Sequence, residues 1–197
     1  MIAIIAVFWK DIYLILKEIL TSSSKLLSKK RPGEILKEDQ NTKLFLMVIV
    51  GTIPTALIGV LFEDEFERLF SAPVSACIML IVTGLILWFT KFVKKADNKT
   101  SPVGFFRALI IGVVQGIAIT PGISRSGITI ATALFMGVDT VSAARYSFLL
   151  SIPAVMGACI LKFKDIAGNN IDMTNIIIGT VIATLVGYFA LRFLVNL

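Results

Sequence analysis

The chain has 197 residues, of which 56% are hydrophobic, 16% are charged and none is histidine. A soluble domain of this length could not bury so much apolar surface, so the composition indicates an integral membrane protein, while the lack of histidine and of a CxxC pair excludes zinc sites and Ser-His-Asp triads. The net charge of +6 comes from short basic clusters between apolar runs, as the positive-inside rule expects, and does not indicate nucleic-acid binding.

The chain begins with MIAIIAVFW, a short apolar stretch that cannot by itself span a bilayer of ~30 Å. We interpret it as a segment at the bilayer interface or as the end of a truncated helix, and the rest of residues 1–42 is polar. Residues 10–43 and 91–107 are rich in lysine and arginine, whereas residues 63–68 read EDEFER. The positive-inside rule therefore predicts that the two basic segments are cytoplasmic and that the acidic loop lies outside.

Four apolar runs are long enough, or nearly so, to cross a membrane as helices. Two of them lie in residues 43–93, on either side of the acidic loop, and two lie in residues 141–196. A helix rises 1.5 Å per residue, so about 20 apolar residues cross the hydrocarbon layer. The predicted fold is therefore all-α: a polytopic protein of the cell membrane in which residues 1–197 form one membrane domain.

Residues 103–138 form a further apolar segment, which Pro121 and Gly122 interrupt. Proline and glycine break helices, and neither half of the segment is long enough to span alone. We therefore expect a re-entrant hairpin: one half-helix enters, an irregular loop lies near the midplane, and a second half-helix returns to the same side. Small residues recur in the first half and predict close packing against another helix; they are Gly104, Ala108, Gly112 and Gly116.

The loop of this hairpin reads TPGISRSGIT, residues 120–129, and contains Arg125 with no acidic neighbour. An arginine inside the membrane costs about 3 kcal/mol on insertion scales, so such residues usually mark function. Its guanidinium can bind phosphate through two parallel hydrogen bonds. The following helix, which we expect to start near Gly127, directs its positive end at the loop. Gly122 and Gly127 would let the backbone approach such a ligand. The alternative is structural: the arginine reaches an interface or caps carbonyl groups.

The run PGISRSGIT, preceded by GVVQGIAIT and followed by ATALFMGV, resembles the second signature of the undecaprenyl-diphosphate phosphatases, the bacitracin-resistance membrane phosphatases. The stretch AARYSFLLSIPAVMGA and the order of the spans extend the resemblance over essentially the whole chain. The resemblance implies a fold of two inverted repeats, each with a re-entrant hairpin. It also implies hydrolysis of undecaprenyl diphosphate to the monophosphate, which is reused in cell-wall synthesis.

The resemblance implies roles for individual residues. Arg125 would clamp the phosphate, and Gln115 stands where the second repeat echoes an acidic position of the first, so it is either a substrate-binding residue or a helix-packing amide. The remaining implied site residues are the hydroxyl ligands Ser124, Ser126 and Thr129 and the substrate-binding Gly122 and Gly127. A divalent cation, Mg²⁺ or Ca²⁺, is implied as cofactor without an evident ligand set. The implied partners are a polyprenyl diphosphate lipid and the bilayer, and a homodimer is left open.

Two features of the family are missing from this chain. The family's first signature, a Glu-x-x-x-Glu-type helix followed by a serine-rich loop with histidine, normally precedes the first full span, and the family ends with one further helix. We therefore expect a partial member that holds one of two hairpins and has little phosphatase activity by itself. The alternatives are a polyprenyl-phosphate translocase, since broken helices near the midplane are also transporter architecture, and a non-catalytic remnant.

Overall fold

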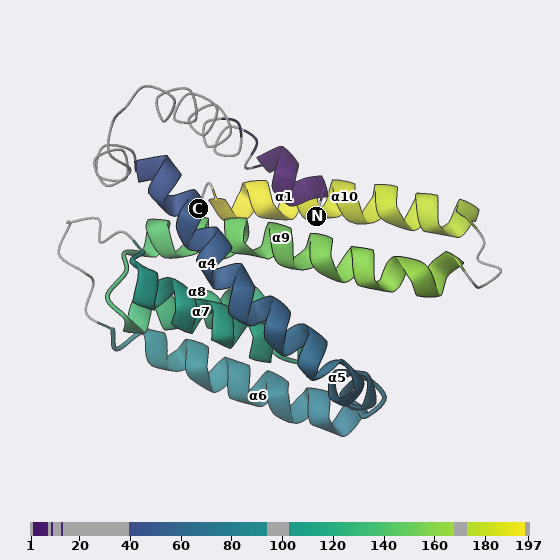
Figure 1. Cartoon of the computed structure of the whole chain (residues 1–197), viewed down its shortest axis with the longest axis horizontal. Helices are drawn as coiled ribbons and strands as arrows, with labels where there is room; N and C mark the ends of the chain where they lie inside the picture. Colours follow the sequence, from purple (N-terminus) through teal and green to yellow (C-terminus); the bar gives the residue numbers. More distant parts are fainter. Residues whose placement is uncertain are drawn as a thin grey trace. The chain divides into compact units, whose positions relative to one another are not determined.

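The computed structural model describes residues 2–7, 9, 13, 40–93, 103–167 and 173–195. All regular secondary structure in these residues is helical (Figure 1), so the predicted all-α class is confirmed. Four of the described helices are long and apolar enough to cross a membrane, as a polytopic membrane protein requires. The described residues fall into two compact units, one drawn from residues 1–43 and 155–197 and the other from residues 44–154.

In the first unit, the short helix α1 (Ile2–Val7) packs against α10 (Met173–Val195). Ala3 is buried there, and a Cβ placed on Gly187 would stand 3.3 Å from the Ala3 Cβ. Small residues allow helices to approach closely in this way. The apolar start of the chain is therefore a helix that packs on the last span, while most of the basic segment 10–43 lies outside the described residues.

The second unit contains the hairpin and the helices that surround it. Its long helices contain proline, which membrane helices tolerate where neighbours satisfy the freed carbonyl groups; the prolines are Pro54 and Pro153. The helices that contribute to this unit are α4 (Gln40–Leu61), α5 (Glu63–Phe70), α6 (Pro73–Thr90), α7 (Phe105–Ile117), α8 (Arg125–Phe135) and the first part of α9 (Thr140–Ala167).

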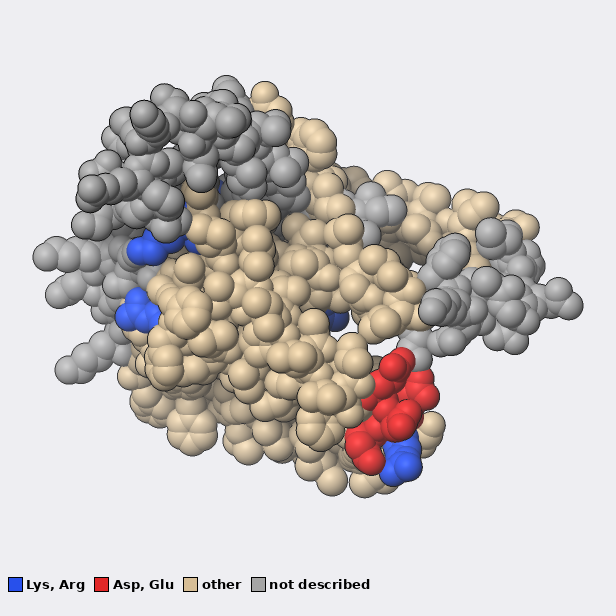
Figure 2. Space-filling model, in the orientation of Figure 1, with Lys and Arg blue, Asp and Glu red and all other residues tan. Residues whose placement is uncertain are grey.

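The acidic segment after α4 is the helix α5, whereas the sequence predicted a loop. Its first turn contains Glu63, Asp64 and Glu65, and acidic side chains stabilise the positive end of a helix. Arg68 donates to the Glu65 carboxylate at 3.0 Å, a spacing at which opposite charges meet on a helix surface. None of the residues of α5 is buried, and Figure 2 shows the acidic side chains gathered in one exposed cluster.

Helices α4 and α7 approach each other through glycine. A Cβ on Gly112 would collide with the backbone of Gly51, and a Cβ on Gly116 would stand 2.8 Å from the Ile58 side chain. The Thr55 hydroxyl on α4 also donates to the carbonyl oxygen of Gly112 at 2.8 Å. The predicted small-residue packing is thus present at these two positions of α7, whereas Gly104, which precedes the helix, has open space around it.

The hairpin enters and leaves at one end of the second unit. Figure 1 shows that α7 begins, and α8 ends, at the same end at which α6 ends and α9 begins. The two half-helices have 13 and 11 residues, so each is less than about 20 Å long, short of a bilayer. The structure thus contains the hairpin that the sequence predicted. Its re-entrant place in the membrane and the inverted repeat, which requires a second hairpin, stay predictions.

Candidate functional site

The loop between α7 and α8 turns tightly and is backed by α6. The Thr120 backbone N–H donates to the carbonyl of Ile117 at 3.1 Å as α7 ends. Gly122 then adopts a φ of +88°, a left-handed conformation that favours glycine. A Cβ at this position would also collide with the backbone of Ala76 in α6. Glycine at 122 is therefore required by the loop itself, apart from any ligand.

Ser124 is the N-cap of α8. Its backbone is extended, and its Oγ accepts a hydrogen bond from the Gly127 N–H at 3.3 Å, the usual way in which a serine satisfies a free amide in the first turn. A Cβ on Gly127 would stand 2.9 Å from that Oγ, so the glycine leaves room for the cap. Because of this cap, α8 begins at Arg125, earlier than the start that the sequence predicted near Gly127.

Arg125 is the first residue of α8, and its side chain is partly buried, whereas Ser124 and Ser126 on either side are exposed. No acidic residue lies in the first turn of α8. A helix N-terminus carries a partial positive charge of roughly half a unit, so the guanidinium adds a full positive charge to an end that is already positive. An anion at this point would interact favourably with both. The structure thus brings three predicted site residues together at one helix end.

Thr129 lies one turn further along α8 and is fully buried. Its Oγ1 lies 2.8 Å from the carbonyl oxygen of Arg125, 3.2 Å from that of Ser126, and 2.6 Å from the Oγ of Ser147 on α9. The hydroxyl is therefore engaged within the protein in this structure. A role as phosphate ligand stays a prediction, and the contacts give Thr129 an internal role at the start of α8.

Gln115 is buried where α4, α7 and α9 meet. Its Nε2 donates to the Leu150 carbonyl at 3.3 Å and to the Thr55 Oγ1 at 3.5 Å, so the amide connects α7 to both neighbouring helices. Its Oε1 is buried without a hydrogen-bond partner. These contacts favour the helix-packing amide of the two roles that the sequence left open, and substrate binding by Gln115 stays a prediction.

Two residues that support the loop were not found from the sequence. Thr83 is the buried residue of the otherwise exposed or partly exposed α6. Its Oγ1 accepts from the Ser124 N–H at 3.4 Å and lies 2.9 Å from the carbonyl oxygen of Met79. The second residue is Ser147. The signal in both cases was a hydroxyl in an apolar span, which occurs too often to single out either residue without its neighbours.

The hairpin supplies positive charge and hydroxyl groups but no carboxylate, because residues 103–138 contain neither Asp nor Glu. Asp139, which follows, uses its Oδ1 to accept from the Ser142 N–H at 2.9 Å at the start of α9. In the part of the chain that the structure describes, no group of three or more His, Cys, Asp or Glu side chains could hold a metal ion. Mg²⁺ and Ca²⁺ prefer carboxylate oxygens, so the described residues do not fit such an ion.

Comparison with known proteins agrees with this arrangement. The family described as "Bacitracin resistance protein BacA" matches residues 1–197. A relative from Desulfatibacillum aliphaticivorans is 43% identical over 162 residues, which are 82% of this chain and 59% of the relative. This chain therefore spans less than two thirds of the length of that relative, which bears the name "Undecaprenyl-diphosphatase".

Two other relatives with the same name are covered to a greater extent. The protein from Desulforapulum autotrophicum is 43% identical over 191 residues, which are 96% of this chain and 69% of the relative. The protein from Methanothermobacter thermautotrophicus is 47% identical over 155 residues, which are 77% of this chain and 86% of the relative. The similarity therefore extends over the hairpin and over most of the spans around it.

Proposed function

The chain belongs to the bacitracin resistance protein BacA family, and on that premise we propose that it acts in the hydrolysis of undecaprenyl diphosphate, the activity in the names of its relatives. Water would cleave the phosphoric anhydride, and the products would be the lipid monophosphate and inorganic phosphate. The monophosphate would return to cell-wall synthesis, and the activity would contribute to the resistance to bacitracin for which the family is named.

One observation carries this proposal: Arg125 lies at the N-terminus of α8, at the tip of the hairpin formed by α7 and α8, between two exposed serines. A diphosphate is a compact anion with several oxygens, and a guanidinium can bind two of them at once. The partial positive charge of the helix end adds to this attraction. Because the surrounding helices are apolar, the lipid chain of the substrate can remain in the bilayer while its headgroup reaches the loop.

Phosphoryl transfer needs neutralised charge on the transferred group and a nucleophile in line with the leaving oxygen. Arg125 and the start of α8 would neutralise charge, and the hydroxyl groups of Ser124 and Ser126 would donate to the phosphate. If one of these serines attacks instead, the lipid monophosphate leaves as the anhydride bond breaks, and water then releases inorganic phosphate from the phosphoserine. A general base typically contributes about 10²–10⁴-fold, and residues 103–138 contain neither a carboxylate nor a histidine. We therefore propose that a complete site needs a second hairpin carrying the family's first signature. A divalent cation in that complete site stays a prediction.

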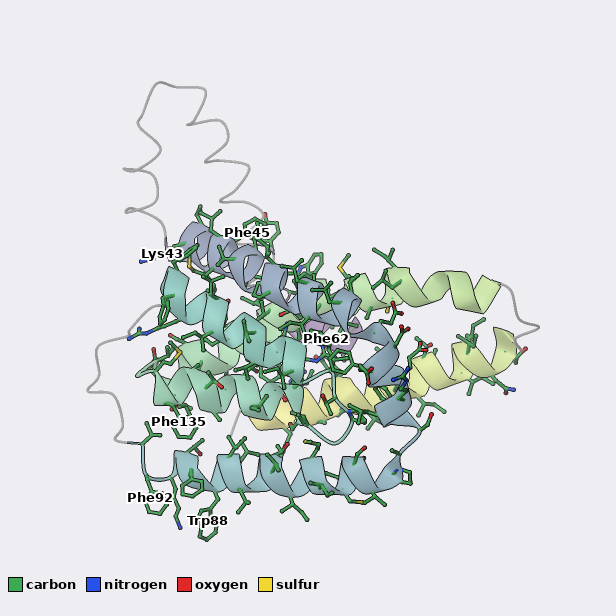
Figure 3. All side chains as sticks on the ribbon, turned by 60° about the horizontal axis from the view of Figure 1, so that its bottom comes forward. Lys43, Phe45, Phe62, Trp88, Phe92 and Phe135 are labelled. Carbon is green, nitrogen blue, oxygen red and sulfur yellow. The ribbon has the colours of Figure 1, made fainter. Side chains whose placement is uncertain are left out.

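We also propose that the hairpin opens towards the cytoplasm. Trp88, Phe92 and Phe135 lie at the end of the unit where the hairpin opens (Figure 3). There the Lys91 Nζ lies 3.4 Å from the ring centroid of Trp88 and 4.9 Å from that of Phe92. Aromatic residues are typical of either membrane interface, and lysine and arginine at the ends of spans are typical of the cytoplasmic one. The acidic α5 lies at the other end (Figure 1).

The function is tested by phosphate release. Purified protein in detergent is mixed with undecaprenyl diphosphate, both alone and after co-expression with a hairpin that carries the family's first signature. Release that is lost in the Arg125→Ala variant supports the phosphatase, and no release from either preparation would refute it. A translocase would instead move undecaprenyl phosphate across vesicle membranes without releasing phosphate, and a non-catalytic remnant would do neither. Light scattering on the same preparations tests for the homodimer.

A further inference from the structure

We propose that Ser147 is a positioning residue for Arg125: its hydroxyl, acting through that of Thr129, holds the first turn of α8 in place. Ser147 lies on α9, outside the hairpin. This role rests on the proposed anion site at the start of α8, because loss of the Ser147 hydroxyl would weaken the binding of an anion at that site.

Ser147 and Thr129 form a pair of buried hydroxyls. Their exposed fractions are 3% and 0%, and their oxygens are 2.6 Å apart, which is close even for a hydrogen bond between hydroxyls. Neither group can exchange its partner for bulk water, and a buried polar group without a partner is costly. The Ser147 hydroxyl therefore depends on that of Thr129, which also has partners in its own helix, and the pair joins α8 to α9.

The number of available protons decides which of the two hydroxyls donates and which accepts. Each hydroxyl has a single proton to donate. The carbonyl of Arg125, 2.8 Å from the Thr129 Oγ1, can only accept. Both protons are used when Thr129 donates to that carbonyl and accepts from Ser147. The result is a chain of hydrogen bonds that runs from α9 through Thr129 to the backbone of Arg125, and successive bonds of this kind strengthen one another.

The first turn of α8 needs such support. The helix has 11 residues, and helices shorter than roughly 12 residues are marginal unless tertiary contacts stabilise them. It also begins with a cation at its positive end, which the helix dipole disfavours. Thr83 holds the preceding residue from α6, through the Ser124 N–H, and Ser147 holds the turn from α9. The hydroxyls of Thr83 and Ser147 would thus hold the backbone at Arg125 from two neighbouring helices, in a position where its side chain can bind a ligand.

Loss of the Ser147 hydroxyl would leave Thr129 bonded to its own helix but would release the first turn of α8 from α9. Two-point binding of a phosphate depends on the position of the guanidinium within a fraction of an ångström. We therefore expect Ser147→Ala to weaken anion binding at Arg125 although Ser147 does not touch the anion.

The test compares two serines of α9. Ser147→Ala removes the hydroxyl that bonds to α8, and the matched control is Ser151→Ala, because the Ser151 hydroxyl donates to the Phe148 carbonyl of its own helix at 2.6 Å. The affinity of the detergent-solubilised chain for inorganic pyrophosphate is measured by calorimetry. We expect about tenfold weaker binding for Ser147→Ala, and binding within about twofold of the unaltered chain for Ser151→Ala and for Ser147→Thr, which keeps a hydroxyl.

Measuring Ser147→Ala in an Arg125→Lys chain as well separates a positioning role of Ser147 from an effect on the stability of the fold. If Ser147 acts through Arg125, then Ser147→Ala should weaken pyrophosphate binding much less in an Arg125→Lys chain, because the effects of coupled residues do not add. A merely structural serine would lower the melting temperature equally in both backgrounds and leave the affinity unchanged. Should Ser147→Ala fail to fold, Ser147→Cys replaces it with the same expectation, since a thiol is a weak donor.

The outcomes also distinguish this inference from the function on which it rests. If the unaltered chain does not bind pyrophosphate, the proposed anion site is wrong and the inference is wrong with it. If the unaltered chain binds pyrophosphate and Ser147→Ala binds it equally well, the site stands and Ser147 has no positioning role.

Discussion

At the scale of single residues, binding at the loop should depend on the shape of the Arg125 side chain as well as on its charge. In Arg125→Lys the charge is kept, but a lysine cannot offer two parallel N–H groups to one phosphate. We expect the affinity for pyrophosphate to fall about tenfold, which corresponds to ~1.4 kcal/mol. The control is Arg107→Lys, in the same hairpin but in the first turn of α7. Equal losses in the two variants would argue for a general charge effect instead of a clamp.

Gly122 offers a prediction about the loop backbone. Gly122 and Gly137 both have positive φ, +88° and +75°, so alanine at either position should cost roughly 1–2 kcal/mol in backbone strain. Only at Gly122 would the new Cβ also collide with the backbone of α6; at Gly137 it would meet open space. Gly122→Ala should therefore lower the melting temperature in detergent more than Gly137→Ala does. A greater loss for Gly137→Ala would contradict the close approach of α6 to the loop.

The predicted site residues differ in how far the sequence alone could describe them. Arg125 and its two serines were identifiable because a cation with flanking hydroxyls in an apolar run is rare and costly. The burial of Thr129 was not predictable, since it depends on Ser147, a residue of another helix. The same holds for Gln115, whose partners are Thr55 and Leu150. Contacts across helices are set by packing and leave no periodic pattern in the sequence.

At the scale of helices, the packing of α4 against α7 should depend on Gly112. In Gly112→Ala the added methyl group would collide with the Gly51 backbone, and overfilling of a packed interface typically costs 1–3 kcal/mol. The control is Gly84→Ala in α6, where nothing lies within 4 Å of the added Cβ and alanine is the better helix former. We expect a lower melting temperature for Gly112→Ala and an unchanged or higher one for Gly84→Ala. A Gly112→Ala chain as stable as the unaltered one would refute the close helix contact.

Helix boundaries were less predictable than the helices themselves. The long apolar runs predicted the spans. Helix α8, however, begins at Arg125 because Ser124 acts as its cap, whereas its predicted start was near Gly127. The segment EDEFER is helical as α5 because three of its four acids lie in the first turn and its arginine in the last. Both differences come from interactions at helix ends, which involve single hydrogen bonds and charges and have little effect on hydrophobic patterns.

At the scale of the whole molecule, composition and length were sufficient for the membrane class and the number of long spans. In hydrocarbon, a helix is one of the few structures in which every backbone polar group has a partner. The four apolar runs accordingly correspond to the four helices of the described residues that are long and apolar enough to span. The hairpin followed from one proline, one glycine and two short half-helices. The inverted repeat stays a prediction, because it requires a second hairpin and one such hairpin lies in the described residues.

The last prediction concerns catalytic activity of the whole chain. The described hairpin holds Arg125 and two exposed hydroxyls, which can bind a phosphate, but the chain has no histidine and residues 103–138 have no carboxylate. Without a general base, hydrolysis should lose about 10²–10⁴-fold. We therefore expect little or no phosphate release from undecaprenyl diphosphate by the chain alone, although it should bind pyrophosphate.

Co-expression with a hairpin that carries the first family signature should restore this activity, because it would supply the missing acid–base groups and further walls of the site. The measurement is phosphate release by the purified complex, and the control is the same complex with Arg125→Ala, which should be inactive. A complex in which Arg125→Ala stays active would show that the added hairpin works without this one. Rapid, Arg125-dependent release by the chain alone would show the opposite, that the groups around Arg125 carry the chemistry without a partner.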